Sequence, residues 1–256
     1  MKHTVIKYPL MAVMMLTGFG AVAVADDTMG KAWTIQAGLV AAGNTSYYKD
    51  VGEEGWILPL IIAEYKRLYF HGVEAGYSLY QWGNNQEVLV VSGVTFDGYN
   101  STDSDYLSGM EDRDKAWEIG FAYKFLIGGG ELEIRLMNDL GTSHEGYSIR
   151  VDYEHELWSG EKHMIAWYSG LEYWDESRTD YYFGVKESEA LPDRAAYSPS
   201  GHVQAFTGLN AVKKINSRIS LIANTEYRTA GATVSDSPIT SRNDQLSGYL
   251  GIFTEF

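Results

Sequence analysis

The segment YSIRVDYEHELW, residues 147–158, decides the fold. Its odd positions carry Tyr147, Ile149, Val151, Tyr153, His155 and Leu157, and its even positions carry Ser148, Arg150, Asp152, Glu154, Glu156 and Trp158. Side chains alternate between the two faces of a β-strand, so a period of two predicts a strand here. One face of this strand is apolar and aromatic, and the other is charged.

The same period recurs along the chain from Trp33 onward. It is clear in residues 117–125, 131–136 and 219–228. These segments run for about 9 to 14 residues, whereas strands of globular proteins are usually about 5 to 6 residues long. Turn signals at 128–130, 159–162 and 216–217 join them. No helical period is sustained after the first 25 residues, and we therefore expect one all-β domain of long antiparallel strands.

Two architectures fit such strands. A soluble sandwich or lipocalin-like barrel buries the apolar face inside, whereas a membrane barrel turns it toward lipid and keeps the charged face in the lumen. The strand length and the Tyr and Trp residues near the strand ends favour the membrane. The last segment does too, because Leu250, Ile252, Thr254 and Phe256 share one face. A final strand that ends in Phe resembles the recognition signal of bacterial outer-membrane barrels.

Composition excludes several other classes. The chain has 256 residues, a formal net charge of −14, no Cys and a mean hydropathy of −0.23. The acidic balance argues against nucleic-acid binding, and the absence of Cys excludes disulfides and thiolate metal sites. The mean hydropathy rules out a bundle of transmembrane helices but is compatible with a transmembrane barrel.

Residues 1–25 have the features of a cleaved secretory signal peptide. Lys2 and Lys7 precede an apolar run, and Ala23-Val24-Ala25 forms a small-x-small cleavage site. The alternative is an N-terminal membrane anchor. With cleavage, residues 26–256 form the mature domain, which we expect to be an outer-membrane β-barrel.

Bacterial outer-membrane barrels usually have an even number of strands, with short periplasmic turns and long outer loops, and this rule sets the expected strand number. Long connections are expected at 42–56, 98–114, 176–202 and 230–244, and short ones at 82–85, 128–130, 159–161 and 215–217. If 67–81 bends near Gly72 into two strands, the total is twelve and all the long loops share the outer face. Arg67–His71 is too short to span a bilayer, so ten strands with an irregular segment is the alternative.

Several motifs, in order along the chain, resemble those of the MipA/OmpV family of outer-membrane proteins. They are residues 57–61 (ILPLI), 107–110 (LSGM) with Arg113, 138–139 (ND) with 144–146 (HEG), 180–185 (DYYFGV) with 196–199 (AYSP), and 235–239 (SDSPI). The resemblance implies an outer-membrane barrel. The family's namesake implies a scaffold that joins a lytic murein transglycosylase to a murein synthase. The family supplies no catalytic, cofactor or metal residues to transfer.

The sequence offers residues for two kinds of catalytic site. A phospholipase-like site needs Ser and His together, but Ser148 and His155 lie on opposite faces of one strand. An omptin-like site would use Asp and His pairs at the rim, where Asp139, His144, Asp103 and Asp105 lie. Interface, turn-forming and solvating roles explain all of these residues, and we expect neither a catalytic site nor a cofactor.

The charged face suggests a lumen function. Glu131, Glu133, Arg135, Arg150, Asp152, Glu154 and Glu156 lie on two consecutive strands, so we expect opposite charges to meet across the pair. A cation-preferring channel and a salt-bridged plug both fit. The acidic segment Asp97–Asp114 suggests either divalent ions bridging to lipopolysaccharide or a solvated loop, and it lacks calcium-loop spacing.

The sequence therefore predicts a non-enzymatic outer-membrane barrel. Expected contacts are membrane lipid, lipopolysaccharide and, as a scaffold, a lytic murein transglycosylase and a murein synthase. A small-solute channel or environmental-response barrel is the alternative function, and an outer-membrane hydrolase is a third.

Overall fold

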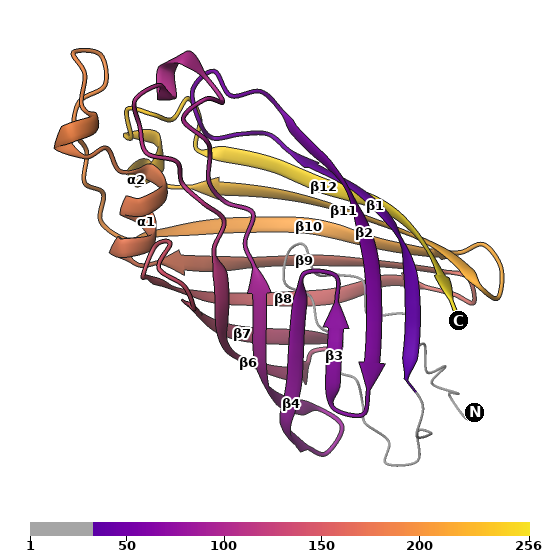
Figure 1. Cartoon of the computed structure of the whole chain (residues 1–256). Helices are drawn as coiled ribbons and strands as arrows, with labels where there is room; N and C mark the ends of the chain where they lie inside the picture. Colours follow the sequence, from indigo (N-terminus) through magenta and orange to yellow (C-terminus); the bar gives the residue numbers. More distant parts are fainter. Residues whose placement is uncertain (1–32) are drawn as a thin grey trace.

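A computed structural model describes residues 33–256, in which twelve antiparallel strands close into one barrel (Figure 1). The signal peptide expected at 1–25 lies outside the described residues. Each strand pairs with its neighbours in sequence, and β1 pairs with β12 to close the wall. The all-β antiparallel barrel and the choice of twelve strands over ten are confirmed.

The strands differ in length, and one of them is very short. Their bounds are β1 Thr34–Asn44, β2 Glu54–Tyr65, β3 Leu68–His71, β4 Glu74–Trp82, β5 Gln86–Val94, β6 Trp117–Ile127, β7 Gly130–Asp139, β8 Tyr147–Ser159, β9 His163–Trp174, β10 His202–Lys214, β11 Ile219–Ala230 and β12 Asp244–Glu255. Four short helices lie in the connections: η1 Asp105–Leu107, α1 Glu176–Phe183, η2 Glu187–Glu189 and α2 Ala232–Ser235. No helix in the described part of the chain is long and apolar enough to span a membrane.

The bend expected near Gly72 divides residues 68–82 into β3 and β4. Gly72 has a φ of +65°, a left-handed conformation that glycine adopts without steric cost. Its N–H donates to the carbonyl oxygen of Ile61 at 2.8 Å, which ends the pairing of β2 with β3. The four-residue β3 therefore rises only part of the way up the wall.

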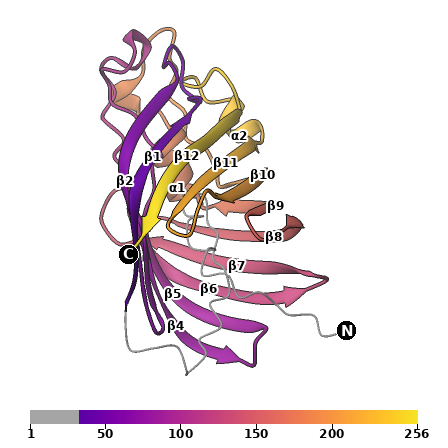
Figure 2. The ribbon, with the colours of Figure 1, turned by 90° about the vertical axis from the view of Figure 1, so that its right-hand side faces the viewer.

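The barrel has a short-turn end and a long-loop end. Turns of two to four residues, at 66–67, 83–85, 128–129, 160–162 and 215–218, share the end that carries the C-terminus. The connections 45–53, 95–116, 140–146, 175–201 and 231–243 lie at the other end (Figures 1 and 2). In bacterial barrels short turns face the periplasm, which makes the long-loop end the outer one.

The alternating pattern places apolar side chains on the outside of the wall. Ile57 is 76% exposed and Leu250 is 62% exposed, whereas Arg150 and Asp152 are buried in the lumen. One position departs from the expected faces. A bulge between Glu156 and Trp158 shifts the register of β8 against β9, so Trp158 lies opposite Ile165 on the outer face, whereas Glu156 still lies opposite the buried Ala166. Glu156 is exposed near the end of β8 and does not belong to the buried luminal charges.

The long loops fold into a compact unit with its own core, which we call the outer cap (Figure 2). Its buried apolar side chains come from four connections and two strand ends: Tyr47, Tyr48, Tyr99, Leu107, Met110, Trp174, Tyr182, Phe183, Val185, Ala230, Val234 and Ile239. The ring centroids of Tyr48 and Tyr99 are 4.6 Å apart, an edge-to-face contact. The barrel thus has a second hydrophobic core above the membrane-spanning wall.

Candidate functional site

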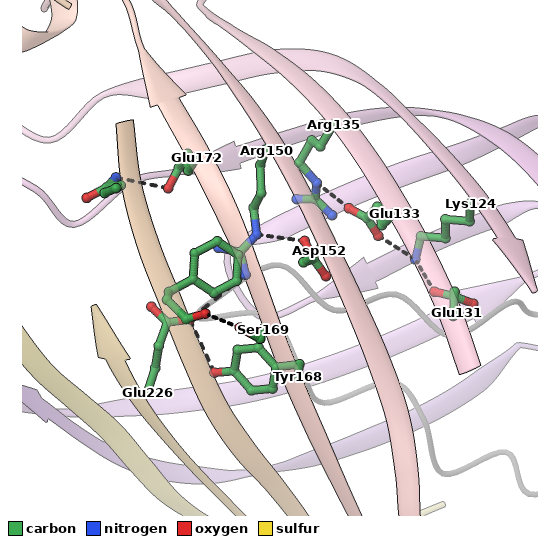
Figure 3. A network of polar contacts seen from close by, with 12 residues as sticks. Lys124, Glu131, Glu133, Arg135, Arg150, Asp152, Tyr168, Ser169, Glu172 and Glu226 are labelled. Atoms are coloured by element: carbon green, nitrogen blue, oxygen red, sulfur yellow. Dashed lines mark hydrogen bonds and ion pairs between the residues drawn. The ribbon is translucent and has the colours of Figure 1, made fainter. Parts of the chain in front are cut away.

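The charged faces of β6 and β7 form a chain of ion pairs inside the lumen, and β8 carries a separate pair (Figure 3). Lys124 Nζ lies 3.1 Å from Glu133 Oε2, and Arg135 Nε lies 2.6 Å from Glu133 Oε1. Arg135 Nη1 reaches Glu74 Oε2 on β4 at 2.7 Å. Lys124 and Glu133 are only 1% and 2% exposed, so these charges interact in a nearly dry interior.

Opposite charges do not meet across β7 and β8, and this sequence expectation is wrong. The register places Arg135 opposite Arg150, Glu133 opposite Asp152, and Glu131 opposite Glu154. The charges are instead compensated along each strand. Arg135 pairs with Glu133 two residues away, and Arg150 Nε pairs with Asp152 Oδ1 at 2.9 Å. Residues i and i+2 share a face of a strand, so an acid and a base at this spacing can neutralise each other without help from the neighbouring strand.

A second group of polar side chains covers β9, β10 and β11. Arg228 lies 2.8 Å from Glu172 and 3.0 Å from Glu226, and the Tyr168 hydroxyl donates to Glu226 at 3.2 Å. Arg150 Nη2, 3.9 Å from Glu226 Oε2, joins this group to the Arg150–Asp152 pair of β8. The luminal ion pairs thus form two groups, one on β4, β6 and β7 and the other on β8, β9 and β11.

The remaining side of the lumen is filled by apolar side chains. Its buried cluster comprises Val40, Ile62, Val212, Ile222, Tyr249 and Phe253, from β1, β2, β10, β11 and β12. Together with the ion pairs, this cluster occupies the interior with side chains that are at most about 15% exposed. This arrangement matches the plugged alternative better than the open one.

A cavity of about 240 Å³ lies between the luminal ion pairs and the outer cap. Helix α1 supplies Arg178, whose Nη1 lies 2.6 Å from Glu118 Oε1 and whose Nη2 lies 3.2 Å from Asp97 Oδ2. Its guanidinium also stacks 4.1 Å above the ring of Trp174. Burial raises the pKa of Asp97, and the Arg178 guanidinium opposes that rise.

The structure separates the residues of the two catalytic hypotheses. Ser148 is buried in the lumen, whereas His155 lies on the other face of β8, stacked on Tyr153 with ring centroids 6.3 Å apart. The Asp139 carboxylate accepts N–H groups of Gly141, His144 and Glu145 at 2.8–3.0 Å, which is a turn-capping role.

His144 is held by its neighbours in the rim. The N–H of Gly146 donates to its Nδ1 at 3.0 Å, so Nε2 carries the proton and donates to Glu118 Oε1 at 3.2 Å. Glu118 thus accepts from both His144 and Arg178. This geometry orients a loop and shows no nucleophile next to the imidazole.

The acidic segment 97–114 is largely folded into turns. Asp103 accepts the N–H of Asn100 at 2.7 Å, and Asp112 accepts the N–H of Ser101 at 2.6 Å, a bond that lowers the pKa of Asp112. Asp105 begins η1. Within residues 33–256, no group of three or more His, Asp or Glu side chains has the arrangement needed to hold a metal ion.

An ion pair in the outer cap was missed by the sequence analysis. Arg113 Nη2 lies 3.1 and 3.0 Å from the two carboxylate oxygens of Glu189, and both side chains are 3% exposed. Arg113 also donates to the carbonyl oxygen of Tyr181 at 2.7 Å. Burial disfavours the Glu189 carboxylate, but N–H groups of Glu111 and Lys186 and the Arg113 guanidinium hold its pKa below the usual value. These residues are 76 positions apart, so only the fold brings them together.

A closed barrel with an apolar outer surface and a charged interior defines a transmembrane β-barrel protein. Residues 37–256 match the protein family described as MltA-interacting protein MipA. The chain therefore belongs to the MipA/OmpV family, as its motifs indicated.

Curated relatives agree with this assignment. The chain is 30% identical to the outer membrane protein Omp26La of Vibrio anguillarum over 62% of its own length and 61% of that relative. It is 27% identical to the outer membrane protein OmpV of Vibrio cholerae, covering 84% of each chain. It is 23% identical to the MltA-interacting protein of Escherichia coli, covering 77% of this chain and 79% of the relative. The protein is thus an outer-membrane protein, and these relatives are named as membrane or interacting proteins and not as enzymes.

Proposed function

We propose that this barrel is a non-enzymatic scaffold that holds a peptidoglycan-remodelling enzyme at the inner surface of the outer membrane. The observation that carries the proposal is the charge of the periplasmic turns. The connections at this end hold four basic residues, Lys66, Arg67, Lys162 and Arg218, and one acidic residue, Glu161. All five side chains are exposed.

We call the exposed turn residues Lys66, Arg67, Lys162 and Arg218 the basic rim, and their charge is opposite to that of the protein as a whole. The outer connections hold sixteen acidic and seven basic residues, and the whole chain has a net charge of −14. An exposed patch of one sign steers a partner of the other sign and orients its approach. The rim therefore suits a protein with an acidic docking surface.

Two further facts support the scaffold over a channel. One relative is named MltA-interacting protein, and a murein transglycosylase is accordingly the partner class that we assign to this rim. The luminal ion pairs and the apolar cluster leave the interior filled, which favours a function at the surface of the barrel. Each turn is short, so a docked partner must contact several turns together.

In-cell cross-linking tests this proposal. The tagged protein should capture a lytic transglycosylase or a murein synthase above the level seen with an unrelated barrel. A charge-reversed variant of the rim (K66E/R67E/K162E/R218E) should lose that capture while the barrel still migrates differently in boiled and unboiled samples. R242E, which reverses an exposed charge at the outer end, is the matched control and should keep the capture.

The result that refutes the scaffold is capture of assembly machinery and lipopolysaccharide-associated proteins alone. Capture that is equally strong with the reversed rim would refute the assigned surface. Planar-bilayer conductance then becomes the next measurement, since a small-solute channel is the alternative function.

A further inference from the structure

The barrel wall has a notch on its outer half, between β2 and β5. Residues Glu54–Ile61 of β2 pair with β1 on one side, but β3 reaches only Ile62 on the other. The hairpin of β3 and β4 turns back at residues 72–73, and β4 meets β5 no higher than Gly93. Among the described strands none continues the ladder above this hairpin, and β5 itself ends at Val94, whose N–H donates to the carbonyl oxygen of Val73 at 3.2 Å.

The sequence of β2 suits this unpaired edge. Ile61 directs its carbonyl oxygen toward Gly72 on the notch side, and residues two apart in an antiparallel strand point their backbone groups the same way. Pro59 therefore faces the notch, where its missing N–H removes no ladder bond. The outward side chains of Ile57 and Ile61, 76% and 47% exposed, make the flank of the notch apolar.

Two aromatic side chains close the top of the notch. Trp56 on β2 and Phe96 after β5 have ring centroids 6.1 Å apart. Both line the 240 Å³ cavity beneath the outer cap and also a larger cavity of about 900 Å³ at the outer rim. They therefore form the partition between the interior and the outer rim.

An ammonium group already lies on these rings. Lys115 Nζ is 4.9 Å from the ring centroid of Phe96 and 5.7 Å from that of Trp56. Lysine is a flexible, exposed side chain here, and a cation over an aromatic face is attracted by the ring quadrupole. The outer-rim cavity also carries Glu53, Glu54, Asp97, Asp103 and Asp114 against Arg113 and Lys115. Its surroundings thus favour a cation.

We propose that the notch binds an alkylammonium amphiphile from the outer leaflet. Its head group takes the place of the Lys115 ammonium on Trp56 and Phe96, beside Glu54, and its chain lies along the apolar edge of β2. This site is separate from the periplasmic rim and does not depend on the scaffold function. Lys115 acts as an internal competitor that keeps the site closed without a ligand.

Photolabelling of the whole protein in phosphatidylethanolamine vesicles tests the proposal. The probe is a dodecylamine that carries a diazirine in its chain, and the matched probe is the corresponding alcohol. We expect the amine to label Ile57 and Ile61 about tenfold more than Leu171 and Leu209 of β9 and β10, which are 55% and 43% exposed on the outer surface. The alcohol should label both pairs of residues alike.

Variants of exposed or rim residues sharpen the test. K115A should raise amine labelling of the notch by about two- to thirtyfold, the range expected from one cation–π contact. E54Q should lower it about fivefold through the loss of one nearby charge. K49A is the control, because Lys49 Nζ lies 4.6 Å above the Tyr106 ring in a loop contact outside the notch.

Three results would overturn the proposal: equal labelling of the two pairs of residues by the amine, equal notch labelling by amine and alcohol, or no increase with K115A. Unequal migration of boiled and unboiled samples confirms that each variant is a folded barrel.

Discussion

Replacing Arg113 by Met tests whether the outer cap is held by its buried ion pair. The change removes a guanidinium bonded to both oxygens of Glu189 and to the carbonyl oxygens of Tyr181 and Glu111. It also removes cation–π contacts to the rings of Tyr99 and Tyr181. The methionine keeps most of the volume, so the loss is mainly electrostatic.

The size of the effect follows from burial. Both partners are 3% exposed, and removing one member of a buried pair costs about 3–5 kcal/mol because the other charge is left uncompensated. The ladder of the wall is untouched, so this cost falls on local opening of the outer cap. Each loss of about 1.4 kcal/mol raises the equilibrium constant for local opening tenfold, so amide exchange in the cap should accelerate by about two to four orders of magnitude.

Hydrogen exchange read by mass spectrometry measures this opening. The reporting amides are those of Glu111 and Lys186, which donate to the two oxygens of Glu189 at 2.8 and 3.0 Å. K186A is the control, because it breaks an ion pair with Glu111 in which both side chains are more than half exposed. Exposed pairs contribute about 0–1 kcal/mol. Cap exchange within threefold of the wild type in R113M, or equal acceleration in K186A, would refute the reasoning.

Three further predictions concern the cap and the wall. The folded-state pKa of Glu189 lies below its unfolded value, so the pair with Arg113 contributes its full stability above about pH 4.3 and loses it as the pH falls through the folded-state pKa. Amide exchange in the cap, corrected for the intrinsic rate, should therefore rise only below about pH 4.3. An unchanged exchange rate at lower pH would contradict this role of the pair. R135M leaves Glu74 without its ion-pair partner and removes one of the two cations that face Glu133, and it should cost about 3–5 kcal/mol. This cost should lower the temperature at which the unboiled gel form disappears, and an unchanged temperature would exclude a stabilising role. G120V should prevent formation of the unboiled gel form, because a Cβ at position 120 would lie 1.8 Å from the carbonyl oxygen of Leu136. A normal difference between boiled and unboiled samples would show that β6 and β7 can move apart at this position.

Most of the wall could be predicted from the sequence because its signal is local. The alternation in residues 147–158 gave the faces of β8 up to Glu156, and Gly72 marked the turn that made the strand number even. The bulge after Glu156 was not predictable, since it depends on the register against β9 and not on the period. The same dependence explains why Arg135 faces Arg150 although both strands were placed correctly.

The outer cap lay beyond sequence reasoning for a different reason. Its residues come from loops without a period, and Tyr48, Tyr99 and Phe183 meet only after the barrel has brought their loops together. The family motifs were the part of the sequence that could have pointed to the cap, because residues 107–110, 180–185 and 235–239 supply much of the cap core. Those motifs marked membership but did not show that they pack against one another.

The outer cap also bears on how the two ends of the chain are joined. The seam between β1 and β12 closes a loop of about 200 residues, for which chain entropy alone costs about 5 kcal/mol. Cap hydrogen bonds continue the seam beyond the wall: the N–H of Thr45 donates to Leu246, that of Ser241 to Tyr47, and that of Lys49 to Ile239, each at 2.9 Å. Tyr47, Tyr48 and Ile239 then bury their side chains in one core. Completion of the cap and closure of the cylinder are therefore coupled, and a barrel whose first and last strands have not met cannot assemble its outer surface.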